Sequence, residues 1–179
     1  MSTPAPTDAP TTTPTVVPTL APEPTEAPED EPIETVIAGR IRGFFDAREA
    51  ANAGPVPDPA DPALAEVAAG EALASAAAET QRRLDDGRAI RAGEQALAEI
   101  WVGSVRLDDD TAQAAACSVD DGVIYEVATG DVVNDDVVTH SYVVDLQLSG
   151  DAWKVIRVVR LQQWEGVAGC ALARGDFPF

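Results

Sequence analysis

The spacing of apolar residues changes at Gly87, and this change limits the folds open to the chain. Before Gly87, apolar residues recur every three or four positions, which is the period of an amphipathic helix. After Gly87, apolar and polar residues alternate over long segments separated by turns rich in Asp and Gly, which is typical of antiparallel strands. Helices followed by a run of strands predict a segregated α+β domain.

Three helices are expected before the change of period. The first begins at Pro32, which suits a first helical turn, and ends before Gly54. Asp61 is expected to cap a short second helix that has Pro62 at its first position. The third helix is expected over residues 71–86, where apolar residues again recur at helical spacing.

Four or five antiparallel strands are expected in the second half of the chain, as one strongly bent sheet wrapped around a helix. The last of them, "AWKVIRVVRLQQW", is apolar on both faces, with Val155, Val159 and Leu161 on one and Ile156 and Val158 on the other. This pattern predicts a strand buried centrally in the sheet. The strand segments are residues 94–107, 111–119, 123–133, 137–148 and 152–164.

Residues 1–31 differ in composition from the rest of the chain. They are mostly Thr, Pro, Ala and acidic residues, so they predict a disordered, proline-stiffened spacer ahead of a domain at residues 32–179. Such a tail is typical of exported proteins, and we expect Met1 to stand where an export signal ended, in the place of a lipid-modified Cys. The localisation predicted is therefore extracytoplasmic, secreted or lipid-anchored in the cell envelope; the alternative is a disordered cytoplasmic tail.

The charge of the chain excludes two classes of partner. Its 31 acidic residues against 12 basic ones give a net charge of -19. A field of this sign repels nucleic acid and anionic lipid surfaces. Contact with a membrane is therefore expected only through an N-terminal lipid anchor, since no stretch approaches the roughly 20 apolar residues of a membrane helix.

The order of elements and four segments of the sequence carry a resemblance. The segments are "GRIRGFFDAREAA", "AQAAACSVDD", "EVATGDVV" and "GDAWKVIRV". Together they resemble the NTF2-like (cystatin-like cone) superfamily over residues 31–169, most of all the exported, often lipid-anchored domains of high-GC Gram-positive bacteria. The resemblance implies three helices packed in the concave face of a curved four- to five-stranded sheet. It also implies a cone that holds a small ligand at its open end, as in the ketosteroid isomerase and scytalone dehydratase relatives.

The two cysteines, Cys117 and Cys170, match no zinc or redox motif, because such motifs need closer pairs. In an exported domain they predict a disulfide that joins the C-terminal segment to the second strand. In a cytoplasmic protein they would be two buried free thiols.

His140 and Tyr142 alternate with apolar residues on one face of a predicted strand, and this face is expected to point into the cone. A base and a hydroxyl side by side can move a proton, and Asp46 on the first helix is the candidate for a third, carboxylate member. The competing interpretation is structural. His and Tyr on an apolar face commonly satisfy each other or the backbone, and Asp46 would lie on a solvated helix face.

The predicted ligand-binding residues lie on the first helix and on two strands. No metal or cofactor is expected, because the acidic runs at 108–110 and 134–136 are better explained as hairpin turns than as calcium loops. The ligand-binding set is Phe44, Phe45, His140, Tyr142 and Trp153. For Trp153 the alternative is a core or rim residue under the helices.

Two functions follow from these observations. The first is a non-catalytic, exported binding domain that takes a partner protein on its sheet face or a small apolar ligand in the cone, with a homodimer through the sheet face as one possibility. The alternative is a small-molecule isomerase or dehydratase of ketosteroid-isomerase type that uses His140 and Tyr142.

Overall fold

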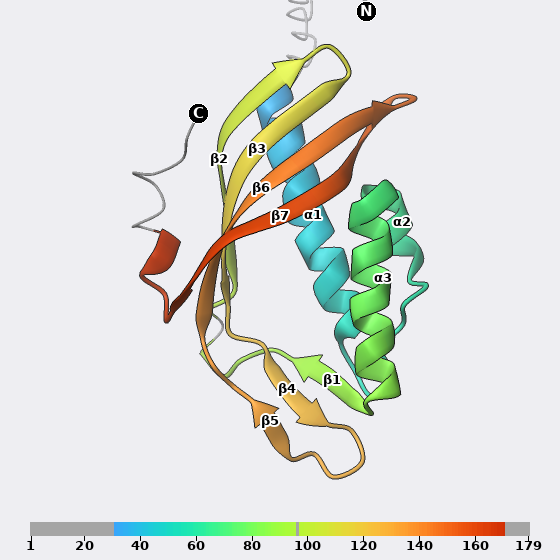
Figure 1. Cartoon of the computed structure of the whole chain (residues 1–179), viewed down its shortest axis with the longest axis vertical. Coiled ribbons are helices and arrows are strands. Elements are labelled where there is room, and N and C mark those ends of the chain that lie inside the picture. Colours follow the sequence, from blue (N-terminus) through green and yellow to red (C-terminus); the bar gives the residue numbers. More distant parts are fainter. Residues whose placement is uncertain (1–30, 96, 171–179) are drawn as a thin grey trace, which may run out of the picture. The chain divides into compact units, whose positions relative to one another are not determined.

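The computed structural model describes residues 31–95 and 97–170, and it confirms an α+β fold with three helices (Figure 1). The predicted spacer, apart from Glu31, lies outside the described residues. The helices are α1 (Ile33–Asn52), α2 (Pro62–Val67) and α3 (Gly70–Asp85). The strands are β1 (Arg88–Arg91), β2 (Glu99–Asp108), β3 (Thr111–Asp120), β4 (Val123–Glu126), β5 (Val132–Asn134), β6 (Val138–Ser149) and β7 (Ala152–Glu165).

The strands form two antiparallel sheets rather than the single sheet that the sequence predicted. A four-stranded sheet has the order β2-β3-β6-β7, and a three-stranded sheet has the order β1-β4-β5. The segment predicted as one strand over 123–133 folds into the β4–β5 hairpin, because the turn residues "TGD" interrupt its alternation. Strand β1 was not predicted, since four residues are too few to show a period. The two sheets do not pair with each other as a closed barrel.

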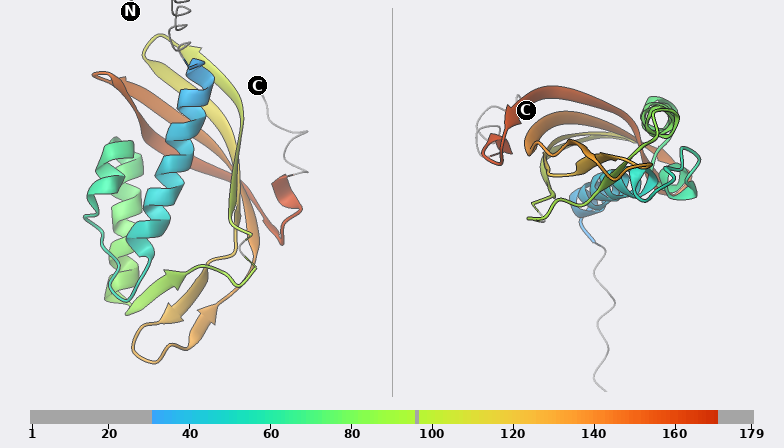
Figure 2. Two further views of the ribbon diagram at one scale, coloured as in Figure 1. Left: turned by 180° about the vertical axis from the view of Figure 1, so that it is seen from behind. Right: turned by 90° about the horizontal axis from the view of Figure 1, so that it is seen from below.

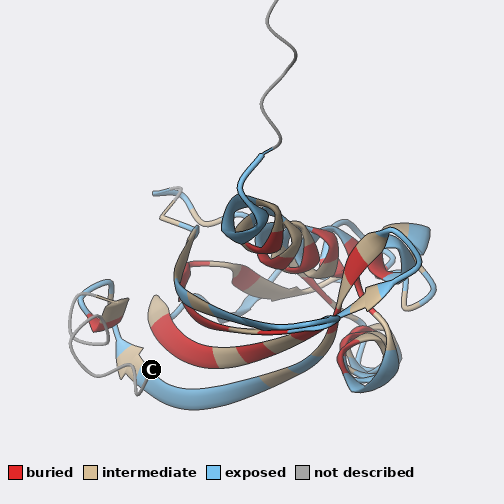
Figure 3. Ribbon diagram, turned by 90° about the horizontal axis from the view of Figure 1, so that it is seen from above, coloured by how far each residue is buried: buried red, intermediate tan, exposed pale blue. Residues whose placement is uncertain are grey.

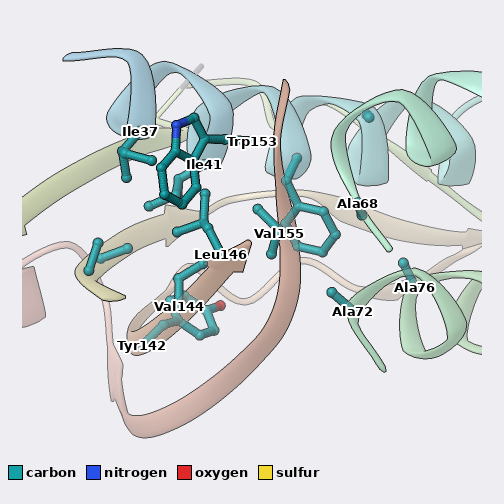
Figure 4. Close-up of a cluster of buried hydrophobic side chains, with 14 of the residues drawn as sticks. Ile37, Ile41, Ala68, Ala72, Ala76, Tyr142, Val144, Leu146, Trp153 and Val155 are labelled. Atoms are coloured by element: carbon teal, nitrogen blue, oxygen red, sulfur yellow. The ribbon is translucent and has the colours of Figure 1, made fainter. Parts of the chain in front are cut away.

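Helix α1 runs along the concave face of the four-stranded sheet, with α3 beside it near β7 (Figure 2). The buried residues lie on the side of α1 that faces the sheet (Figure 3). Small side chains on β3 let the helix approach closely, since Ala112, Ala114 and Ala116 all belong to the core. Figure 4 shows Ile37 and Ile41 of α1 packed near Trp153 and Leu146 of the sheet.

Strand β7 is an edge strand, so the prediction that it lies centrally is wrong. Two register shifts against β6 add an extra residue to β7, at Ile156 and at Leu161. Each bulge interrupts the alternation of the strand, so that Val155 and Val158 pack on the core while Val159 and Leu161 are exposed. A run that is apolar on both faces therefore reflects a bulged edge here and not a strand covered on both sides.

The predicted disulfide is present. Cys117 on β3 is bonded to Cys170, with their Cα atoms 5.6 Å apart. The bond ties the end of the described chain to the middle of the sheet, as the sequence suggested. Disulfides of this kind are typical of oxidising, extracytoplasmic compartments. None of the described helices is long and apolar enough to cross a membrane.

Gly93, in the connection between β1 and β2, allows that connection to approach the residues that follow β3. A Cβ atom at Gly93 would lie 2.3 Å from the carbonyl oxygen of Asp121 and 2.5 Å from its Oδ2. We expect Gly93→Ala to lower the free energy of unfolding by about 1–3 kcal/mol, because backbone has to move to relieve the overlap. Gly39→Ala on α1 is the control: it meets nothing within 4 Å. It should stabilise the chain by about 0.5–1 kcal/mol in urea unfolding. Equal effects of the two substitutions would contradict this account.

Candidate functional site

Two neighbouring cavities that share four lining residues are lined by the helices and by the sheet. We call the first, of about 250 Å³, the Phe45 cavity, and the second, of about 300 Å³, the His140 cavity. Both are lined by Arg48 of α1, Glu79 of α3, and Asp120 and Tyr142 of the sheet. Together the two cavities are the helix–sheet cleft.

An ion pair between α1 and α3 borders both cavities. Arg48 donates two hydrogen bonds to Glu79 Oε2, from Nε at 3.0 Å and from Nη2 at 2.7 Å, and Arg83 donates to Oε1 at 2.9 Å. Burial alone would raise the pKa of Glu79, but the charge and hydrogen bonds of Arg48, with those of Arg83, lower it overall. The pKa of Arg48 is raised: burial opposes this shift, but the contact with Glu79 outweighs it. Arg48 and Glu79 therefore stay charged inside the cleft.

Aromatic rings form the floor of the cleft. The ring centroids of Phe44 and Phe45 are 5.5 Å apart, those of Phe45 and Tyr142 5.2 Å, and those of Tyr142 and His140 5.9 Å. The row is produced by consecutive helix positions on α1 and by every second residue of β6. Burial raises the pKa of Tyr142, so its hydroxyl remains protonated and lies 3.4 Å from Ser118 Oγ.

Three residues that line the cleft each have a buried polar atom with no hydrogen-bond partner among the described residues. The atoms are Asn52 Oδ1 and Arg83 Nε, of residues that line the Phe45 cavity, and His140 Nδ1, of a residue that lines the His140 cavity. Buried polar atoms in proteins are nearly always paired, because an unpaired one costs about 1–3 kcal/mol. Atoms of this kind gathered around one cleft indicate where a bound molecule would complete the hydrogen bonding.

His140 is neutral and has one ring nitrogen free to accept a hydrogen bond. Its Nε2 lies 3.1 Å from Gln163 Oε1, an acceptor, and 3.5 Å from Arg160 Nη1, a donor. Because the contact with Gln163 is the shorter, we place the proton on Nε2 and leave Nδ1 as an acceptor. Burial lowers the pKa of His140; the bond to Gln163 opposes this shift and the charge of Arg160 adds to it.

A pH titration tests the state of His140. The chain has one histidine, so its ring resonance in a proton NMR spectrum is unambiguous. We expect its midpoint below the ordinary value of 6.5. Because the unfolded chain then binds the proton more readily, the His140 contribution to the free energy of unfolding should fall as the pH drops below 6.5 and should be constant above it. In His140→Gln this part of the pH dependence should vanish. A midpoint above 6.5 would contradict the assignment.

The structure brings most of the predicted site residues to the cleft. Phe44 and His140 line the His140 cavity, Phe45 and Asp46 line the Phe45 cavity, and Tyr142 lines both. Asp46 and His140 thus lie in different cavities, so the proposed catalytic set of three is not assembled in one place. Among the described residues, no group of three or more His, Cys, Asp or Glu side chains is arranged to hold a metal ion.

Trp153 belongs to the core instead. Its side chain is 7% exposed, packs in the hydrophobic cluster beside Ile37 and Ile41, and is not among the residues that line either cavity (Figure 4). The structural alternative for His140 and Tyr142 was that they satisfy each other or the backbone. Each instead contacts another side chain, His140 that of Gln163 and Tyr142 that of Ser118. Asp46 is exposed, as that alternative expected.

Arg48, Asn52 and Glu79 were missed by the sequence analysis, although a signal for two of them was present. The apolar stripe of α1 that includes Ile41 continues at Arg48 and Asn52, where the helical spacing calls for apolar residues. Polar side chains at such positions indicate that the helix faces something other than a closed core. Glu79 carried no comparable signal, because its partner is 31 residues away on another helix.

Comparison with known proteins identifies a similar fold but no family. No protein-family model and no curated protein matches the sequence. Among solved structures, the chain is similar to the intermembrane space region of the chloroplast protein ARC6, with a TM-score of 0.60 and 17% sequence identity. The similarity covers 74% of this chain and 98% of the other. At this identity the likeness shows the fold alone.

Proposed function

We propose that this chain is a non-catalytic, exported binding domain that holds a small organic ligand with an apolar ring in the helix–sheet cleft. The observation that carries the proposal is the combination, in one cleft, of a row of aromatic rings with three unpartnered buried polar atoms. Ligand sites in proteins are commonly apolar cavities with a few converging polar groups. The ring row supplies the first feature, and Asn52, Arg83 and His140 supply the second.

The size of the cleft suits a molecule of one or two rings. The two cavities, of about 250 and 300 Å³, lie just below and at the lower limit of the range for small-molecule sites. The Arg48–Glu79 ion pair crosses the cleft with ordered geometry, so a ligand meets charges that are already held in position. Preorganised sites of this kind lose less entropy on binding.

Export and tethering belong to the same proposal. The disulfide between Cys117 and Cys170 supports an oxidising compartment, and the Pro- and Thr-rich composition of residues 1–31 suits a spacer that holds the domain away from a membrane or wall. An NTF2-like origin would agree with helices packed in the concave face of a curved sheet. A homodimer through the sheet face remains a prediction, for which the exposed Val159 and Leu161 are the candidate contacts.

Native mass spectrometry of protein purified without denaturation from its own cells tests the proposal. We expect a reproducible adduct of small-molecule mass on the folded chain. Ala98→Trp should remove the adduct, because Ala98 is an exposed residue that lines the Phe45 cavity and a large ring there would fill it. Ala60→Trp is the matched control, since Ala60 is also exposed but lines neither cavity. An adduct that both variants retain would place the ligand elsewhere.

The isomerase or dehydratase alternative is favoured by one observation, the neutral His140 beside the protonated Tyr142 in a water-accessible cavity. Such a pair can accept and donate a proton on a cyclic ketone. Asp46 would have no part, because it lines the other cavity. Isomerisation of a β,γ-unsaturated steroid ketone, followed by its ultraviolet absorbance, tests this function. Turnover that is lost in both His140→Gln and Tyr142→Phe would support catalysis, and no turnover would leave binding alone.

A further inference from the structure

The carboxylates of the Phe45 cavity are not neutralised by the chain itself. Asp46 and Glu49 of α1 and Asp120 of β3 are exposed residues that line the cavity, and none of them forms an ion pair among the described residues. Two of the arginines that line the cavity, the partly buried Arg48 and Arg83, are both engaged by Glu79. The cavity wall therefore carries a net negative charge.

More carboxylates lie on the far side of the cavity, and Arg42 is the one remaining cation that lines it. Asp121 accepts a hydrogen bond from Leu97 N at 2.8 Å, and Glu99 lies at the start of β2. A backbone N–H partner satisfies a lone pair of Asp121 but does not cancel its charge. The carboxylates thus come from α1, β2, β3 and the turn after β3, and together they outnumber the free arginine.

Asn52 provides an independent observation at the same place. Its side chain is 2% exposed and lines the Phe45 cavity; Nδ2 donates to Arg48 O at 2.7 Å, while Oδ1 has no partner. An amide oxygen can only accept a hydrogen bond. The group that would satisfy Asn52 is therefore a hydrogen-bond donor, which is the same requirement that the carboxylates impose.

The rest of the cavity wall is apolar and aromatic. Phe45 and Tyr142 present adjacent rings, and Ile90 and Ile100 line the cavity from β1 and β2. Aromatic faces attract organic cations, and apolar walls favour a hydrocarbon body over a bare hydrated ion. A molecule that combines a donor-bearing cation with a ring matches both halves of the wall.

From this arrangement we infer that the ligand of the Phe45 cavity is an organic cation, a protonated amine on an aromatic or aliphatic body. The ammonium lies among Asp46, Glu49 and Asp120 and donates a hydrogen bond to Asn52 Oδ1, and the body packs on Phe45 and Tyr142. The inference rests on the proposed binding function and adds the chemical class of the ligand.

The raised pKa of Glu49 agrees with a cationic ligand at this cavity. Burial raises the pKa of Glu49, and the neighbouring charges of Asp120, Asp46 and Asp121 raise it further. A carboxylate in this position is more readily ionised when a cation enters. An anionic ligand would meet the same three charges and would be repelled.

Three probes of one shape and different charge test the inference on the full oxidised chain. They are phenethylamine, which is protonated at neutral pH, the neutral phenethyl alcohol, and the anionic hydrocinnamate. Binding is followed from the amide shifts of the ¹⁵N-labelled protein. We expect phenethylamine to bind about tenfold more tightly than the alcohol at low salt, with the preference reduced at high salt. Hydrocinnamate should bind most weakly.

Variants on α1 separate the effect of the cavity's charge on binding from the effect of its shape. The double variant Asp46→Asn, Glu49→Gln should lose most of the tenfold preference for phenethylamine and keep its affinity for the alcohol. Glu34→Gln, an exposed carboxylate on the same helix that lines neither cavity, is the control and should change nothing. Asn52→Leu, which keeps a branched side chain but removes the acceptor, should weaken phenethylamine more than the alcohol.

These outcomes distinguish a failure of the cation inference from a failure of the proposed binding function. Equal affinity for the amine and the alcohol, with shifts confined to the cleft, would overturn the cation inference and leave the binding function standing. Tighter binding of hydrocinnamate would also overturn it. If no probe shifts the amides of the cleft, both the inference and the proposed function fail.

Discussion

Loss of the Cys117–Cys170 disulfide is expected to lower the free energy of unfolding by about 4 kcal/mol, because the bond closes a loop with a sequence separation of 53 residues. Without it, the unfolded chain gains the freedom of that loop, and the residues after β7 lose their attachment to β3. The measurement is urea unfolding of the double variant Cys117→Ser, Cys170→Ser beside the oxidised wild type.

Reduced wild-type protein is the control for the substitution itself, since it lacks the bond but keeps the sulfur atoms. It should unfold at nearly the same urea concentration as the double variant. A loss below about 1 kcal/mol in both would show that the end of the chain is held by packing rather than by the covalent link. A large loss in the variant alone would assign the effect to the serine side chains.

Trp153→Ala is expected to lower the free energy of unfolding by about 3–5 kcal/mol, the range for removal of a buried large aromatic side chain. Trp153 is 7% exposed and packs between α1 and the sheet, in the core cluster. A core position and a ligand-site position for Trp153, both open from the sequence, differ in what the substitution does to binding. Thermal unfolding of the full chain measures the loss.

Binding by the milder variant Trp153→Leu decides between the two interpretations. If Trp153 is a core residue, the folded fraction of Trp153→Leu should bind phenethylamine with wild-type affinity. Phe45→Ala, which removes a ring of the cleft itself, should weaken the same probe severalfold while costing less stability, because Phe45 is only partly buried. A binding loss in Trp153→Leu as large as that in Phe45→Ala would return Trp153 to the site.

Much of the fold could be predicted from the sequence, because its signals are local. The stripe of Ile37 and Ile41 predicted α1, and Asp61 predicted the start of α2, where its Oδ1 accepts a hydrogen bond from Ala63 N at 2.9 Å. The pairing of Cys117 with Cys170 followed from their being the two cysteines of a chain that looks exported. Each of these signals depends on residues close together in the sequence or on the number of cysteines.

The errors arose where register or a distant partner decides the outcome. The faces of β7 could not be read from alternation, because bulges at Ile156 and Leu161 change which residues point inward, and no residue type marks a bulge of this kind. Similarly, the Arg48–Glu79 pair depends on how α1 and α3 cross. Alternation on β6 did place His140 and Tyr142 on the cleft side, because the extra residues of both register shifts lie in β7 and leave the alternation of β6 uninterrupted.

The most direct test of the central claim, that the helix–sheet cleft is the binding site, is a measurement of nuclear Overhauser contacts between phenethylamine and the protein. The account predicts contacts from the ring of the probe to the side chains of Phe45, Tyr142 and Ile100, which line the Phe45 cavity. Contacts confined to the exposed Val159 and Leu161 of β7 would contradict it. They would move the binding surface to the edge of the sheet.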